Sequence, residues 1–333
     1  MLIWVGGGQC VMVLSGVDLT IAITGHARGR LNMTISSKFK TIVVAFVIGS
    51  FSSFGAAGVE GSSEPKAYEI PRSQVVPIKD TTTDRQYELY IRLPDDYAKT
   101  ADTKHPVVYA TDGAWHMEML SGAAEYVLPN AIVVVISWQK DSKDDFDGDE
   151  RPHISRFRDY TILPSTNPEV QAKYKVGQAR NHLTFIRNDV IKYVEANYQT
   201  DPAERIYFGF SLGGEFGSYI LFEEPDTFKH YVLGSPAFDP ESLKFLQDLA
   251  AKREADTTPL NANVYVSVGE KETDAIPLIE TFMSTLQSRE DASLNVKDLE
   301  VVAQSNHSEA FPATAVRSFK WLSGLIAENN TGE

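Results

Sequence analysis

A serine lies among closely spaced glycines at residues 207–217, which read YFGFSLGGEFG. Gly209–Gly213 matches G-x-S-x-G, the pattern of a nucleophile elbow, where a serine hydroxyl stands on a sharp strand-to-helix turn. Glycine has no Cβ, so it fits where such a turn brings backbone against backbone. A tight turn with an incidental serine is the alternative. The apolar run 206–210 and the helix-like segment after Ser211 favour a nucleophile.

A serine nucleophile needs a base, and the chain order in this class of elbow is serine, acid, histidine. After residue 58, only His307 among the histidines follows the apolar run 264–268. It lies in the polar stretch QSNHSE (304–309), where it could take the Ser211 proton and return it to a leaving alcohol. The alternative is an ordinary exposed loop histidine.

Three carboxylates are candidates for the acid, because the run 264–268 is followed by GEKETD (269–274). Glu272 is our first choice, since a turn of this kind would direct it toward the histidine. Asp274 is second and could instead cap the next helix, and Glu270 stays open.

A tetrahedral intermediate also needs two backbone N–H donors for its oxyanion. Leu212, directly after the nucleophile, would supply one. The other is expected from the loop TDGAW (111–115), where Gly113 lets the backbone turn and Ala114 donates. We expect Asp112 to fix this turn rather than take part in chemistry.

The elements that must position these residues alternate between short apolar runs and segments with helical spacing. Continuous apolar runs are typical of parallel strands covered on both faces. The pattern predicts an α/β-hydrolase fold, with a mostly parallel eight-stranded sheet, helices on both faces and an N-terminal antiparallel hairpin. The expected strands are 74–78, 86–93, 106–110, 131–137, 206–210, 230–233, 264–268 and 299–303, and the expected helices are 117–126, 177–198, 213–222, 240–252, 275–286 and 313–326.

The first 57 residues have the character of a targeting sequence. From Met33 they contain a basic segment (33–40), an apolar segment (41–54) and a small-residue cleavage site (55–57), which predicts a signal peptide. Residues 1–32 would be either an over-extended start or a membrane anchor, and we favour the first. We expect a linker over 58–72 and a single domain over 73–328, with an irregular insertion at 138–176 that forms a lid or binding loop.

Composition narrows the possible partners. The 333-residue chain has a net charge of −14, and a cleaved signal peptide would leave it more acidic, which disfavours binding to nucleic acid or anionic membranes. Its one cysteine, Cys10, lies before the cleavage site, so the exported protein would have no disulfide or thiolate metal site. The acidic stretch 141–150 fails the EF-hand register. We therefore expect no metal, no cofactor and no stable membrane association.

Several segments in order resemble the putative-esterase branch of the α/β-hydrolases. They are YATDGAW (109–115), RFRDYT (156–161), GFSLGGEFGSYILFEEPDTF (209–228), GSPAF (234–238) and NHSEAFP (306–312). That branch includes siderophore trilactone esterases, S-formylglutathione hydrolases, feruloyl and acetyl-xylan esterases, and mycolyl transferases. One departure concerns the elbow, where histidine is frequent in the family and Phe210 stands here.

The resemblance implies an exported serine esterase, periplasmic or secreted, that acts on a small-molecule ester through an acyl-enzyme. It assigns Ser211, Glu272 and His307 to the catalytic triad, and Leu212 and Ala114 to the oxyanion hole. The residues implied for substrate binding are Trp115, Arg156, Arg158, Tyr160 and Phe210. Aromatic residues in the insertion favour a bulky or aromatic ester. An acyltransferase with the same triad and a non-catalytic binding module are the alternatives.

Overall fold

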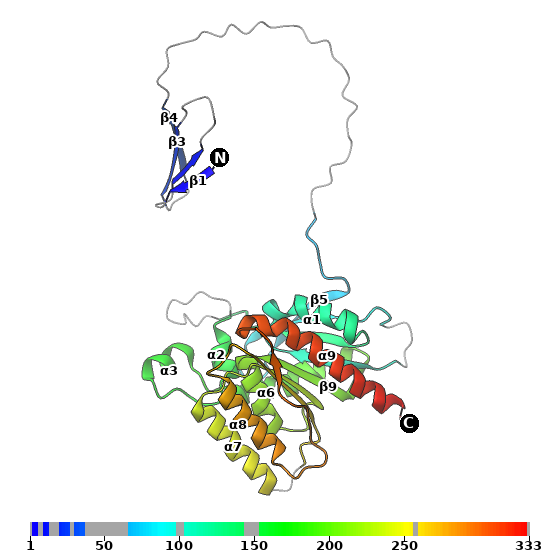
Figure 1. Ribbon diagram of the computed structural model, residues 1–333. Helices are drawn as coiled ribbons and strands as arrows, with labels where there is room; N and C mark the ends of the chain where they lie inside the picture. Colours follow the sequence, from blue (N-terminus) through cyan, green and yellow to red (C-terminus); the bar gives the residue numbers. More distant parts are fainter. Residues whose placement is uncertain are drawn as a thin grey trace, which may run out of the picture. The chain divides into compact units, whose positions relative to one another are not determined.

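The computed structural model describes residues 2–5, 9–12, 20–26, 30–36, 66–97, 103–142, 153–255 and 259–331 (Figure 1). The chain divides into two units, Met1–Pro65 and Lys66–Glu333. In the first unit, antiparallel pairing joins β1 (Leu2–Val5) to β2 (Gln9–Met12) and β3 (Thr20–His26) to β4 (Arg30–Ser36). The apolar segment and the cleavage site of the predicted signal peptide lie outside the described residues, so export stays a prediction.

The second unit is built around a sheet that has nine strands in the described residues, in the order β12-β11-β10-β9-β7-β8-β6-β5, with β13 also paired to β11. β5 and β6 form an antiparallel hairpin, β6 also pairs antiparallel with β8, and the other pairs are parallel. The predicted α/β fold is confirmed. The ninth strand is β12 (Asn295–Val296), which the sequence analysis did not predict, whereas β13 lies within the expected last strand 299–303. The strands are β5 (Ser73–Lys79), β6 (Gln86–Arg92), β7 (His105–Ala110), β8 (Ile132–Ile136), β9 (Thr200–Phe210), β10 (His230–Gly234), β11 (Asn263–Gly269), β12 (Asn295–Val296) and β13 (Glu300–Val302).

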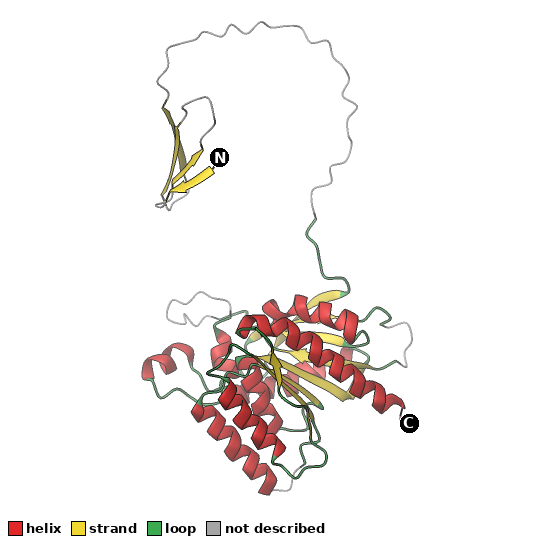
Figure 2. Cartoon of the chain, viewed as in Figure 1, coloured by secondary structure: helices red, strands yellow, loops and turns green. Residues whose placement is uncertain are grey.

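Helices cover both faces of this sheet (Figures 1 and 2). One face carries α1 and α9, and the other carries α4, the π-helix η2, α5, α6, α7 and α8. Strand β7 is buried along its whole length, and its side chains alternate between the two cores, as a doubly covered strand requires. The helices are α1 (Gly113–Val127), α4 (Ala179–Phe185), η2 (Ile186–Ile191), α5 (Lys192–Asn197), α6 (Leu212–Glu223), α7 (Pro240–Ala255), α8 (Ile276–Gln287) and α9 (His307–Thr331).

The structure differs from the prediction in three helical regions. The expected helix 177–198 is interrupted by the π-helical turn η2. The insertion, expected to be irregular, contains α2 (Ser155–Tyr160) and α3 (Pro168–Tyr174), while residues 143–152 of its acidic stretch lie outside the described residues. Helix α9 begins at His307 rather than 313, because Asn306 and Glu309 bond reciprocally to each other's backbone N–H and cap it early.

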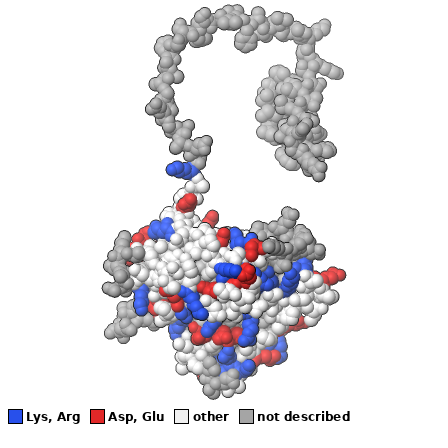
Figure 3. Space-filling model, turned by 180° about the vertical axis from the view of Figure 1, so that it is seen from behind, with Lys and Arg blue, Asp and Glu red and all other residues white. Residues whose placement is uncertain are grey.

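The surface of the second unit mixes charges of both signs. On the face shown in Figure 3, acidic and basic side chains are interspersed rather than gathered into one basic patch. None of the helices in the described residues combines the length and hydropathy that a bilayer span requires.

Candidate active site

Ser211 occupies a strained turn between β9 and α6. Its backbone angles are φ 61° and ψ −123°, a region that residues with a Cβ rarely adopt. The Ser211 N–H donates to the carbonyl of Gly234 (2.9 Å), and its own carbonyl accepts from the N–H groups of Gly214 (2.9 Å) and Ala237 (3.1 Å). These bonds hold the strained conformation in place, which is the arrangement expected of a functional turn.

The glycines on both sides of Ser211 are required by close backbone contacts. A Cβ on Gly209 would lie 2.1 Å from the carbonyl oxygen of Gly213, and a Cβ on Gly213 would lie 2.4 Å from the Thr111 hydroxyl. Tyr207 closes the turn by donating its hydroxyl to that Gly213 oxygen (2.7 Å). The glycine spacing in the sequence therefore reflects a turn too tight for larger residues.

His307 and Glu272 are directly bonded at the carboxyl end of the sheet. The distance from His307 Nδ1 to Glu272 Oε2 is 2.5 Å, and Glu272 Oε1 accepts from Ser235 Oγ and the Gly269 N–H, each at 2.7 Å. Burial alone would raise the pKa of Glu272, but the hydrogen bonds from these three groups outweigh it and lower the pKa below its ordinary value. Glu272 therefore stays ionised beside the imidazole.

The other two candidate acids do not meet His307. Glu270 is exposed and accepts from the backbone N–H of Gln304, and Asp274 is exposed in the turn before α8. Of the three carboxylates in 269–274, the structure thus brings Glu272 to the histidine.

The two predicted oxyanion donors lie at helix starts. Leu212 is the first residue of α6 and Ala114 the second of α1. Backbone N–H groups in a first helical turn have no acceptor within their own helix. In α1 the Asp112 carbonyl accepts from the next two N–H groups, those of Trp115 (2.9 Å) and His116 (3.1 Å), which leaves the Ala114 N–H outside the helical ladder.

Ser211 and His307 open into the same cavity of about 400 Å³. Trp115, Arg156 and Phe210, which the sequence predicted for substrate binding, also line it. Three lining residues were missed by sequence reasoning, because they meet only where α1 packs on α9: His116, Ser308 and Phe311. The ring of His116 stacks on Phe311 with centroids 4.3 Å apart. A larger cavity of about 590 Å³, lined by residues of 202–204, 225–229 and 259–261, contains none of the predicted site residues.

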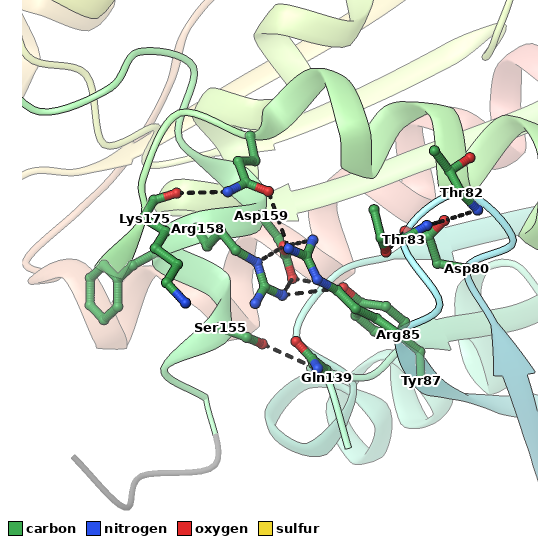
Figure 4. Close-up of polar contacts among 12 residues, drawn as sticks. Asp80, Thr82, Thr83, Arg85, Tyr87, Gln139, Ser155, Arg158, Asp159 and Lys175 are labelled. Carbon is green, nitrogen blue, oxygen red and sulfur yellow. Dashed lines mark hydrogen bonds and ion pairs between the residues drawn. The ribbon is translucent and has the colours of Figure 1, made fainter. Parts of the chain in front are cut away.

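Arg158, which was predicted to bind substrate, does not line the cavity of Ser211 and His307. Its side chain is fully buried, and its Nε and Nη2 donate to Asp159 at 2.7 and 3.0 Å (Figure 4). Tyr87 and Arg85 complete this group: the Tyr87 hydroxyl donates to Asp159 (3.0 Å), and Arg85 lies 3.9 Å from the same carboxylate. Burial and the Asp159 charge together raise the pKa of Tyr87, so the phenol is neutral. We call these four residues the buried network.

Tyr160 is also not among the residues that line the cavity. It is 1% exposed, and its hydroxyl accepts from the Asp112 N–H (3.3 Å). The guanidinium of Arg156 lies 5.7 Å from the centroid of this ring and 5.5 Å from that of Trp115. Tyr160 thus backs the cavity wall instead of facing a substrate.

The family of the chain follows from comparison with known proteins. The model of the family described as "Putative esterase" matches residues 81–331, which is most of the second unit. The chain belongs to this esterase family. Its predicted class, a carboxylic ester hydrolase acting on a small-molecule ester, is thereby confirmed.

Sequence identity to individual relatives is low. The chain is 27% identical over 225 residues to the ferri-bacillibactin esterase BesA of Bacillus subtilis, an alignment that covers 62% of this chain and 73% of the relative. It is 29% identical over 143 residues to the siderophore triacetylfusarinine C esterase of Aspergillus fumigatus, covering 43% and 44% of the two chains. The crystal structure of the BES protein from Bacillus cereus superposes with a TM-score of 0.65 at 21% identity, covering 78% of this chain and 98% of that one. This last similarity shows the shared fold.

Proposed function

We propose that this protein hydrolyses siderophore-type or aryl esters through a Ser211–His307–Glu272 triad and an acyl-enzyme. The observation that carries the proposal is the 2.5 Å bond between Glu272 and His307, whose ring lines the same cavity as the strained Ser211. A nucleophile, a base and an orienting acid in this chain order are the components of acyl transfer by serine.

In this mechanism His307 moves the proton. Because Glu272 engages Nδ1, Nε2 is the nitrogen left to take the Ser211 proton as Oγ attacks the ester carbonyl. The N–H groups of Leu212 and Ala114 stabilise the oxyanion that forms. The carbon–oxygen bond to the alcohol breaks and His307 returns the proton to that alcohol. Water then attacks the acyl-enzyme by the same sequence and releases the acid.

The nature of the cavity wall supports an aromatic or otherwise planar substrate. Phe210 and Phe311 meet edge to face with centroids 5.2 Å apart, and Trp115 is 51% exposed beside them. Such rings favour flat apolar groups. The two curated relatives are named as esterases of siderophores, which supports the siderophore-type part of the proposal.

We also propose that the protein is exported. The segment from Met33 to Ala57 has the three parts of a signal peptide. Sequencing the N-terminus of protein isolated from the native cell should find a start at Gly58. A start upstream of Met33 would contradict export by this signal.

Two substitutions and one matched control test the esterase mechanism. We expect Ser211→Ala to lower kcat for p-nitrophenyl esters by at least ~10³-fold, and Glu272→Gln by roughly 10²- to 10⁴-fold, because the amide no longer holds a charged imidazole. Glu270→Gln, two residues away and not bonded to His307, should stay within about threefold of the wild type. Full activity in folded Ser211→Ala would contradict the mechanism. Product analysis with added alcohol would show a new ester if transfer competes with hydrolysis.

A further inference from the structure

The buried carboxylate of Asp112 accepts hydrogen bonds from side chains of two other segments. It is fully buried, and its oxygens accept from Arg156 Nε (2.8 Å), Arg156 Nη2 (3.1 Å) and Trp138 Nε1 (2.7 Å). Its backbone is in the left-handed region, with φ 61° and ψ 49°. The side chain does not cap α1, although aspartate at this position commonly would.

These contacts join three separate segments directly behind the Ser211 turn. Arg156 comes from α2, Trp138 from the start of the insertion, and Asp112 itself from the loop between β7 and α1 that carries Ala114. A Cβ added to Gly213 would lie only 3.7 Å from Asp112 Oδ2, so the carboxylate packs against the nucleophile turn. Asp112 is therefore placed to position groups around the reacting atoms without touching them.

The pair of Asp112 and Arg156 is ionised. Burial alone would raise the pKa of Asp112, but the Arg156 guanidinium outweighs it and lowers the pKa. Burial alone would lower the pKa of Arg156, and the Asp112 charge raises it instead. The positive charge of Arg156 at the cavity wall is thus compensated by a carboxylate behind it.

The rest of the cavity lining, within the described residues, adds aromatic rings, hydroxyls and the imidazoles of His116 and His307. Burial lowers the pKa of His116, so this imidazole is neutral near pH 7. The cationic group of the wall is therefore the planar guanidinium of Arg156, whose charge is already balanced by Asp112. A bidentate carboxylate leaves an arginine with less to offer a second anion.

We propose that Asp112 determines charge specificity: by neutralising and positioning Arg156, it makes the site accept acyl groups without a negative charge and disfavour acyl groups that bear a carboxylate. The inference rests on the proposed ester hydrolysis and adds the charge class of the substrate. Without the Asp112 charge, Arg156 would become an anion-binding group at the cavity wall.

The test compares kcat/KM for two esters of similar length, neutral p-nitrophenyl valerate and anionic mono-p-nitrophenyl succinate. We expect wild-type protein to favour the neutral ester by at least ~10-fold, and Asp112→Asn to shrink that ratio by about 10-fold or more. General damage to the site would lower kcat for both esters and leave the ratio unchanged, so the ratio separates specificity from a structural role.

Asp159→Asn is the matched control. It makes the same change in net charge beside the other arginine of α2, within the buried network and away from the cavity. The ratio should remain at the wild-type value. An unchanged ratio in Asp112→Asn, or an equal shift in both variants, would overturn the inference.

Two further outcomes are decisive. If Asp112→Asn does not fold, the ratio of kcat/KM for the two esters is measured on wild-type protein at ~0.5 M salt, where surface charge is screened. A retained preference for the neutral ester supports the inference. Equal or faster hydrolysis of the succinate ester overturns it. If wild-type protein hydrolyses neither ester nor any other p-nitrophenyl ester, the proposed function itself fails, which is distinguishable from active enzyme with no charge preference.

Discussion

Arg156 and Arg158 lie two residues apart on the short helix α2, yet they belong to different environments. Arg156 lines the cavity and pairs with Asp112 from another segment, whereas Arg158 is fully buried and pairs with its chain neighbour Asp159. Residues i and i+2 of a helix point about 200° apart, so one side chain faces the site and the other faces away. Similar charge and proximity in the sequence therefore do not imply a shared role.

The largest expected effect is on stability, at Arg158. Replacing it by leucine removes both arginine hydrogen bonds to the buried Asp159 and leaves only the more distant Arg85 to offset its charge, so we expect the free energy of unfolding to fall by roughly 3–5 kcal/mol. Activity of the remaining folded protein should stay within about threefold of the wild type, since no cavity group changes. Urea unfolding and ester kinetics on the same preparations measure both quantities.

Arg156→Leu tests whether the two arginines of α2 have different roles. Its removal opens the cavity toward Asp112, which keeps the Trp138 donor, so we expect a smaller stability loss of about 1–3 kcal/mol together with a clear loss of kcat/KM. If Arg158→Leu damaged catalysis more than Arg156→Leu, the division between a cavity arginine and a buried arginine would be incorrect.

A smaller, pH-dependent effect is expected at Glu215, a buried carboxyl group near the site. It lies in the first turn of α6 and is 4% exposed, and among the described residues no cation offsets its burial. Burial, and then the nearby Asp239 charge, raise its pKa from 4.5 to about 8. The unfolded chain releases this proton at much lower pH than the folded protein. The free energy of unfolding therefore falls as the pH rises from 4.5 to about 8.

Glu215→Gln should remove that dependence. We expect the variant to be more stable than the wild type by roughly 1–3 kcal/mol at pH 9 and close to it at pH 5. Urea unfolding across this range gives the difference, with Glu254→Gln, an exposed substitution on α7, as the control. A wild-type advantage that grows toward alkaline pH would show that the folded protein stabilises the Glu215 carboxylate.

Much of the fold could be predicted because its signals are local. The apolar runs mark most strands to within a few residues, since a strand covered on both faces must be apolar along its length, but they miss the polar start of β9 and the short β12. The order of serine, acid and histidine followed from the same runs. The early start of α9 was missed because residues 304–309 were taken as a polar stretch before the helix, although Asn306 and Glu309 form its cap.

The rest of the site depends on contacts between distant segments. Three carboxylates in residues 269–274 were candidates for the triad acid. The choice among them depends on where His307 lies at the edge of the sheet, which no local pattern specifies. The burial of Arg158 could not be predicted because the insertion was expected to be irregular, so no helical phase separated it from Arg156. His116 and Phe311 meet through the packing of two helices nearly 200 residues apart in the chain.

The central claim is that Ser211 is an activated nucleophile. Intact-protein mass spectrometry after treatment with a fluorophosphonate tests it most directly, on wild type, Ser211→Ala and Ser308→Ala, the last removing the other serine of the cavity. We predict one adduct on wild type and on Ser308→Ala, and none on Ser211→Ala. No adduct on folded wild-type protein, or an adduct that persists in Ser211→Ala, would contradict the claim.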